Sequence, residues 1–272
     1  MELFNYLLKV SACSALFFAF YLLVLRRLTF FKFNRFYLLG SLLVSFVIPA
    51  LQFTIEREVV PSTIAAQTTD MSVSAIDDHL LTSVSVDSIQ VESNGSFNWL
   101  DVLPMIYGTI VLGLLMIAAW RLFQLLKHTK VPVKEINGLK LVAKGTGFTN
   151  CSFFNYVFID ENSLTSAELS VLLAHEEVHA IQYHSVDKLL LMIAKAFLWF
   201  NPIVYLYDKE LEQVHEYEAD ELTSRNIGTE TYATLLLNLA VSKSQNPLLH
   251  NFVKSPIKQR IKMLFNSKSK NM

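Results

Sequence analysis

Three long uncharged apolar runs constrain most strongly how this chain of 272 residues folds. Residues 10–25, 36–54 and 102–120 contain no Asp, Glu, Lys or Arg. A helix needs about 20 mostly apolar residues to cross about 30 Å of hydrocarbon. The alternative, three core helices of a water-soluble protein, would leave too little chain to cover them. We therefore predict three membrane-spanning helices.

The distribution of Lys and Arg predicts the orientation. Four basic residues lie in residues 26–35, one lies in residues 55–98, and six lie in residues 121–144. The positive-inside rule places the N-terminus outside the cytoplasmic (inner) membrane and everything from about residue 121 in the cytoplasm. Glu2 and the lack of a preceding basic cluster distinguish the first run from a cleaved signal peptide. Residues 55–98 are polar and predict a flexible extracytoplasmic loop.

The charge balance excludes some functions. The 23 Lys and Arg residues balance 24 Asp and Glu residues, so no direct nucleic-acid partner is expected. Charged residues make up 17% of the chain, against about 25% in soluble domains. The two cysteines, Cys13 and Cys151, provide neither a disulfide framework nor a CxxC zinc site. The lipid bilayer and a protein substrate are the expected partners.

The cytoplasmic part combines short strands with helices. Asn137-Gly138 between two alternating runs predicts a β-hairpin, and residues 152–160 predict a third strand that could bind an extended substrate by strand addition. Thr165 and Glu168 have the spacing of a capping box before a helix. The predicted fold class is mainly α: multi-pass membrane helices with a cytoplasmic α+β zinc peptidase domain. The predicted boundaries are 1–54 for two membrane helices and a basic loop, 55–98 for the outer loop, 99–126 for the third membrane helix, 127–245 for the peptidase domain and 246–272 for a basic cytoplasmic tail.

Residues 175–179 form the motif HExxH, with His175, Glu176 and His179. Histidines at i and i+4 lie on one helix face, so both imidazoles can bind one zinc ion. Glu176 is then placed to act as general base on a zinc-activated water. The bare motif also occurs by chance as two exposed helix histidines, so a third ligand is needed to support the metal site.

The third ligand is predicted from the acidic segment downstream. Glu216 and Asp220 have the spacing ExxxD, which places both on one helix face. We expect Glu216 to bind zinc and Asp220 to accept a hydrogen bond from the free ring N–H of a ligating histidine. The alternatives are a solvated acidic face, or Glu218 and His215 as ligands instead. Tyr183, His184 and His215 are candidates for stabilising an oxyanion.

Residues 189–207 form a further apolar segment between the two metal-binding helices. Lys195 interrupts this segment and Asn201-Pro202 breaks the helix. Because Glu216 must lie on the same side of the membrane as His175, we expect a re-entrant hairpin whose broken backbone is sheltered by protein or water. A full fourth crossing is the alternative, and it would separate the ligands.

Three segments, SFFNYVFID, LLAHEEVHAIQYHSVDKL and FNPIVYLYDKELEQVHEYEADE, resemble the BlaR/MecR-type antirepressor zinc peptidases. The resemblance extends over residues 1–265. More distantly, the chain is similar to the membrane zinc peptidases that process prenylated proteins. The BlaR/MecR resemblance implies Zn²⁺ on His175, His179 and Glu216 with Glu176 as general base.

The resemblance also implies a regulatory endopeptidase that cleaves a cytoplasmic or membrane-proximal protein such as a transcriptional repressor. A membrane-protein quality-control peptidase and a non-catalytic signalling scaffold are the alternatives. The family's C-terminal β-lactam sensor domain is not expected, because no further apolar run follows. The tail instead places Ile257, Ile261 and Leu264 on one helix face among basic residues, which predicts either binding to anionic lipid or packing on the peptidase domain.

Overall fold

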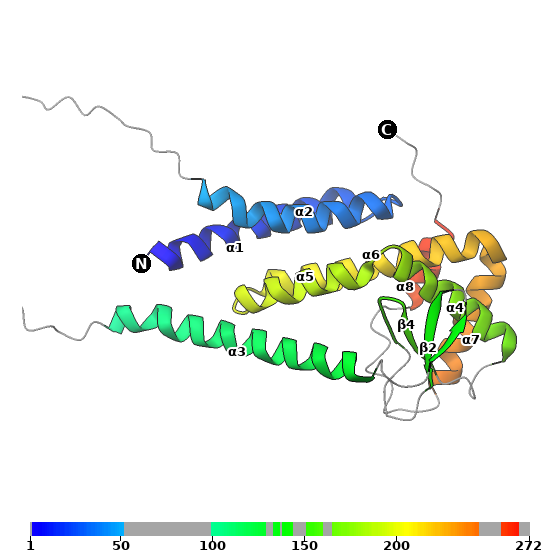
Figure 1. The fold of residues 1–272 in the computed structure, drawn as a ribbon. Helices are drawn as coiled ribbons and strands as arrows, with labels where there is room; N and C mark the ends of the chain where they lie inside the picture. The colour runs from blue at the N-terminus through cyan, green and yellow to red at the C-terminus, as the bar shows by residue number, and fades with distance from the viewer. Residues whose placement is uncertain are drawn as a thin grey trace, which may run out of the picture.

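The computed structural model describes residues 2–51, 99–128, 133–136, 138–143, 151–159, 165–244 and 257–266. It is mainly helical with one small sheet, which confirms the predicted fold class (Figure 1). The elements are α1 (Glu2–Phe20), the π-helix η1 (Tyr21–Leu25), α2 (Phe31–Ala50), α3 (Trp99–His128), β1 (Val133–Ile136), β2 (Leu139–Ala143), β3 (Cys151–Phe153), β4 (Tyr156–Ile159), α4 (Ser166–Ile181), α5 (His184–Phe197), α6 (Pro202–Ile227), α7 (Thr229–Ser244) and α8 (Ile257–Leu264). The predicted outer loop and the rest of the tail lie outside the described residues.

Three helices are long and apolar enough to cross a membrane. The candidate spans in the described part of the chain are Glu2–Leu25, Phe31–Ala50 and Val102–Lys127. Only 6% of the apolar window in the third span is buried inside the protein. A long helix with so much exposed apolar surface requires lipid around it, so the chain is a membrane protein.

The first two membrane helices pack against each other and are joined by a short turn. The Asn34 side-chain amide donates to the backbone oxygens of Leu25 and Leu28, at 3.2 Å each. Asn34 is 2% exposed, so these bonds satisfy buried carbonyl groups at the end of the first helix. They fix the turn between α1 and α2 next to the metal-binding part of the chain.

Helices α5 and α6 form the predicted hairpin. Helix α5 ends at Phe197, and α6 begins at Pro202 after a turn. The Asn201 side-chain oxygen accepts from the backbone N–H of Ile203 at 2.9 Å and caps α6. Figure 1 shows the hairpin running alongside the membrane helices, and both of its arms contact them.

Protein groups shelter the broken backbone at the tip of the hairpin. The Asn201 amide donates to Ser14 Oγ at 3.3 Å, and the Tyr107 hydroxyl of α3 donates to the Phe197 carbonyl at 2.8 Å. Lys195 forms an ion pair with Asp208 at 2.6 Å across the hairpin. These contacts are what a segment at membrane depth needs, because lipid cannot satisfy polar groups. The re-entrant position in the bilayer remains a prediction.

The sheet has the strand order β1-β2-β4-β3. The predicted hairpin is confirmed, because β1 pairs antiparallel with β2 and Gly138 at the turn has φ 78°. The prediction of one strand over 152–160 is wrong: β3 and β4 are two antiparallel strands separated by a turn at Phe154, which has φ 49°. Strand β4 also pairs parallel with β2, so both of its edges are occupied.

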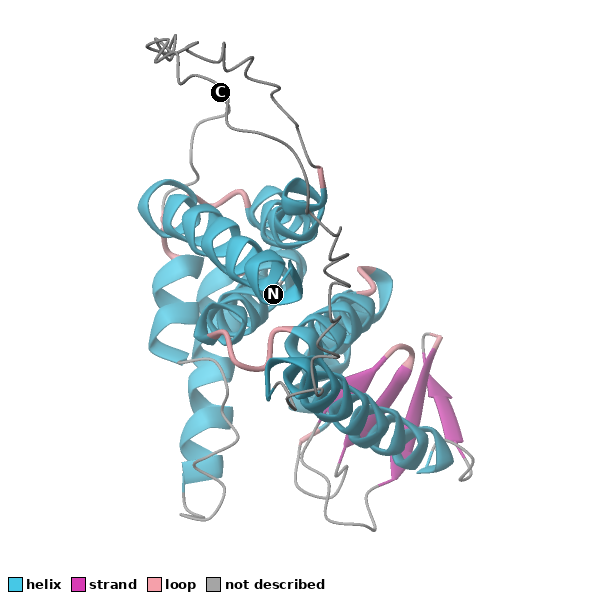
Figure 2. Cartoon of the chain, turned by 90° about the vertical axis from the view of Figure 1, so that its left-hand side faces the viewer, coloured by secondary structure: helices cyan, strands magenta, loops and turns pink. Residues whose placement is uncertain are grey.

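The sheet packs on helix α4. Leu139, Leu141 and Val157 of the sheet form a buried cluster with Leu173 and Ala180 of α4. The predicted capping box is present, since Thr165 Oγ1 accepts from the Glu168 N–H and the Glu168 carboxylate accepts from the Thr165 N–H. Such a cap contributes about 1 kcal/mol to helix stability. Figure 2 shows the sheet as a layer beside the helices, which fixes α4 between the sheet and α6.

The hairpin generates a test of topology. Reporter fusions at about residue 75 are expected to be outside, and fusions at about 145 and 230 are both expected to be in the cytoplasm, because a hairpin returns the chain to its side of origin. Alkaline phosphatase and green fluorescent protein fusions measure this. An outside location at 230 would contradict the re-entrant hairpin.

Candidate metal centre

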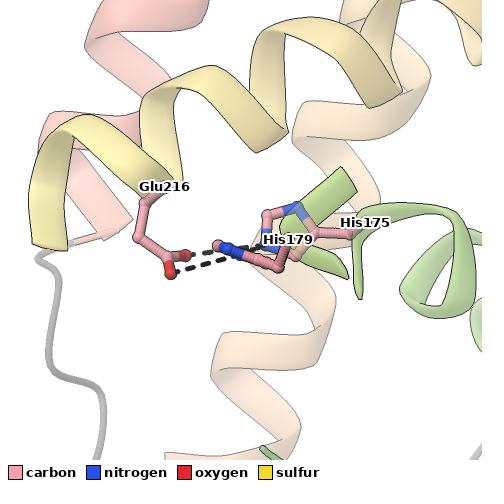
Figure 3. Close-up of side chains that lie close together, drawn as sticks. All are labelled: His175, His179 and Glu216. Carbon is pink, nitrogen blue, oxygen red and sulfur yellow. Dashed lines mark hydrogen bonds and ion pairs between the residues drawn. The ribbon is translucent and has the colours of Figure 1, made fainter. Parts of the chain in front are cut away.

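His175 and His179 of α4 face Glu216 of α6 across the contact between the two helices (Figure 3). The two histidine Nε2 atoms are 3.2 Å apart. Each Nε2 atom lies 3.6 Å from a Glu216 carboxylate oxygen. The three ligand atoms lie within 4.8 Å of one another, so the structure brings the predicted ligands together.

These separations fit a zinc ion. Two donor atoms bound tetrahedrally at about 2.1 Å from one metal lie about 3.4 Å apart. The observed 3.2 Å and 3.6 Å separations are close to this value. Two imidazoles and one carboxylate also form the donor set of a catalytic zinc site with an open position. The residues present therefore fit the metal.

Close packing of α4 and α6 brings the three ligand side chains together. Ala219, on the helix that carries Glu216, is completely buried and has no bulk to separate the two helices. His175 is 6% exposed, whereas the side chains of His179 and Glu216 are 12% and 19% exposed. The three ligand side chains are thus largely shielded from solvent, His175 more than the other two.

Burial and charge oppose each other at the three ligands. Burial acts to lower the pKa of His175, but the hydrogen bond and charge of Glu216, with Asp220, raise it overall. Burial and the neighbouring His175 hold the pKa of His179 well below its usual range. Burial acts to raise the pKa of Glu216, but His175, Arg260 and His179 hold it well below its usual range. An ionised carboxylate and a neutral imidazole are the forms that bind zinc.

Tyr232 of α7 links His175 to Asp220. The Tyr232 hydroxyl lies 3.0 Å from His175 Nδ1 and donates to the Asp220 carboxylate at 2.7 Å. Asp220 itself lies 3.5 Å from this nitrogen, so the predicted direct hydrogen bond is replaced by a path through Tyr232. With zinc on Nε2, the Nδ1–H would donate to the tyrosine oxygen, which fixes the tautomer and the ring orientation. Burial and the charge of Asp220 raise the pKa of Tyr232, so its hydroxyl keeps its proton.

Arg260 of α8 holds both acidic residues. Its guanidinium contacts Glu216 at 2.7 Å and both oxygens of Asp220, one of them at 2.8 Å. Burial acts to lower the pKa of Arg260, but the bonds to Asp220 and the charge of Glu216 raise it overall. Arg260 belongs to the basic tail for which the sequence predicts either binding to anionic lipid or packing on the peptidase domain. The described part of that tail instead packs on α6 and α7, which favours the packed alternative.

His184 supports His179 from the other side. The two Nδ1 atoms lie 2.6 Å apart, and His184 Nε2 lies 3.4 Å from a Glu218 carboxylate oxygen. Because a carboxylate only accepts, His184 carries its proton on Nε2 and accepts the Nδ1–H of His179. Burial lowers the pKa of His184, which keeps it neutral as this arrangement requires.

The alternative ligands lie elsewhere. Glu218 contacts His184, and His215 Nε2 lies 2.8 Å from an Asp187 oxygen. Burial lowers the pKa of His215 to about 4. His184 and His215 are both at most 2% exposed and stack on each other with ring centroids 4.0 Å apart. The structure therefore assigns them to a buried network instead of the oxyanion role considered for them; Tyr183 is exposed and follows α4 in a left-handed conformation.

Glu176 follows His175 directly and is half-buried. Within the part of the chain that the structure describes, its carboxylate forms no hydrogen bond or ion pair. It remains available to a water molecule or a substrate at the open side of the ligands.

One comparison with known proteins gives a match to a family model. Residues 153–264 match the family model described as BlaR1 peptidase M56. This segment contains the three candidate metal ligands and Glu176, and the match agrees with the family that the sequence resembles. Comparisons with curated proteins and with solved structures give no significant match.

Metal content tests the ligand set. Purified protein is expected to hold about one zinc per chain, and alanine at His179 or Glu216 is expected to abolish stoichiometric zinc, because only two protein ligands remain. Glu221→Gln on the same helix is the control and is expected to keep the metal. Full zinc retention by both His175→Ala and Glu216→Ala, measured by mass spectrometry of the metal, would show that the site is elsewhere.

Tyr232→Phe tests the hydrogen bonds behind His175. Removal of the hydroxyl is expected to weaken zinc binding about 10-fold, since groups that orient ligands typically contribute about 10–100-fold in affinity. Tyr217→Phe removes a hydroxyl that contacts Gln213 and no metal ligand, so it is the matched control. Chelator competition measures both. Equal affinities for the two variants would be inconsistent with the role given to Tyr232.

Proposed function

We propose that this protein is a membrane-embedded zinc endopeptidase with a regulatory role. Its substrate would be a cytoplasmic or membrane-proximal protein such as a transcriptional repressor. The convergence of His175, His179 and Glu216, with Glu176 next to His175 in the chain, supports the peptidase chemistry. The match to the BlaR1 peptidase family supports the regulatory role.

A zinc ion held by the three ligands would supply Lewis-acid activation of water and polarisation of the peptide carbonyl. Glu176 accepts a proton from the attacking water at a carboxylate oxygen. It then returns this proton to the nitrogen of the scissile bond as that bond breaks. Tyr232 and His184 hold the two imidazoles in orientation during these steps, because each contacts the ring nitrogen turned away from the ligand cluster.

The substrate is proposed to bind along the sheet edge nearest to the metal-binding helix. Strand β3 is an edge strand and contacts α4. Strand β4, which formed part of the predicted binding strand, is paired on both sides and cannot accept another strand. An extended peptide added beside residues 151–153 would lie at the sheet edge formed by the strand that contacts the metal-binding helix α4.

Glu176→Gln tests the proposed chemistry. This variant is expected to keep its zinc and lose at least about 100-fold in peptidase activity, because general-base catalysis contributes about 10²–10⁴-fold. Glu177→Gln is the matched control, since this side chain points about 100° away around the helix. Equal loss in both variants would contradict the role of Glu176.

The same Glu176→Gln variant tests the regulatory role. Expressed in the native membrane, it is expected to trap one discrete protein that the wild type cleaves. Many misfolded membrane proteins in the trap would instead support quality control, and no cleavage difference between the two proteins would support a non-catalytic scaffold.

A further inference from the structure

Arg35 is a buried arginine at the peptidase end of membrane helix α2. In the sequence it is one of the four basic residues in residues 26–35 that predict the orientation. Its side chain is 8% exposed, so it does not serve as a charge at the membrane surface. A buried arginine requires partners, because isolated burial of a charge is costly.

The guanidinium has three partners, all in the peptidase part of the chain. Its Nε donates to an Asp187 oxygen at 2.6 Å, and its Nη2 donates to the Gln182 carbonyl, also at 2.6 Å. Its Nη1 lies 3.8 Å from a Glu218 oxygen. Gln182 is the C-terminal cap of α4, so Arg35 holds the end of the helix that carries both histidine ligands.

A continuous chain of contacts leads from Arg35 to the metal ligand. The Glu218 oxygen near Arg35 is the same oxygen that contacts His184 Nε2. His184 Nδ1 in turn contacts His179 Nδ1 at 2.6 Å. Through these contacts Arg35 holds the Glu218 carboxylate in place against His184, and His184 orients the His179 ring so that its Nε2 atom faces the ligand cluster.

Asp187 reinforces this arrangement. The oxygen that accepts from Arg35 also contacts His215 Nε2 at 2.8 Å, and His215 stacks on His184. Glu218 thus contacts His184 at its Nε2 atom, and the His215 ring packs on the face of His184. Arg35 contacts Glu218 and also Asp187, the carboxylate that binds His215.

We propose that Arg35 is a positioning residue through which the second membrane helix holds the metal ligand His179. The proposal rests on the proposed zinc site. It implies that a shift of α2 changes the metal affinity and coordination of the peptidase without a contact between α2 and the metal.

The test compares zinc affinity and cobalt spectra of full-length protein in nanodiscs. Arg35→Gln is expected to weaken zinc binding about 10–100-fold in chelator competition and to shift the visible absorption bands of the cobalt-substituted protein. Arg35→Lys keeps the positive charge but loses the several donors of the planar guanidinium. Its zinc affinity is therefore expected to lie between those of Arg35→Gln and the wild type. Glu218→Gln is expected to reproduce the effect while it leaves the ion pair with Asp187 in place.

Two controls separate positioning from general stability and charge. Arg27→Gln removes an exposed arginine in the turn before α2 and is expected to leave zinc affinity and the cobalt spectrum unchanged. Leu38→Ala removes a side chain of α2 that is 1% exposed in the core, and is expected to lower the melting temperature without a change in the cobalt spectrum.

Wild-type zinc affinity and cobalt spectra in folded Arg35→Gln and Glu218→Gln would overturn the proposal. If Arg35→Gln does not fold, wild-type zinc affinity and cobalt spectra in both Glu218→Gln and Arg35→Lys would overturn the proposal. Wild-type protein that binds no zinc would contradict the proposed function itself, and so the two failures are distinguishable.

Discussion

The three candidate metal ligands lie on two helices, and an apolar segment separates these helices in the chain. His179 and Glu216 can meet only if this segment turns back, and the α5–α6 hairpin makes that turn at Asn201-Pro202. The turn leaves polar groups among apolar helices: Ser14 accepts from the Asn201 side-chain amide, and Tyr107 donates to the Phe197 backbone carbonyl. The membrane helices thus satisfy a structural requirement of the peptidase site in addition to anchoring it.

Each of the three candidate ligands also depends on a helix other than the one that carries it. His175 is oriented from α7 by Tyr232, Glu216 is held from α8 by Arg260, and His179 is supported from α5 by His184. Buried charges of this kind are costly unless every partner is present, and removal of one partner leaves the others uncompensated. We therefore expect the site to be sensitive to displacement of any of these helices. Such sensitivity suits a peptidase that a signal controls.

Local sequence signals predicted the elements that depend on local physics. The three spans follow from apolar length, the capping box from Thr165 and Glu168, and the placement of two histidines on one face from helix periodicity. The ExxxD spacing also indicated Glu216, which the structure places beside both histidines.

The remaining features depend on pairings that no local pattern contains. Arg35 and Arg260 appeared as topology and tail charges, because their carboxylate partners are far away in the sequence. Tyr232 had no motif around it. The single strand predicted over 152–160 is divided because Phe154, which is not a glycine, adopts a positive φ that its residue type gives no reason to expect.

The central claim is that one metal ion joins the HExxH helix to Glu216. X-ray absorption at the zinc edge of the purified full-length protein tests it most directly. The account predicts nitrogen and oxygen neighbours at about 2.0–2.1 Å, with the outer-shell scattering of two imidazoles. Sulfur neighbours at about 2.3 Å, or scattering from fewer than two imidazoles, would contradict it.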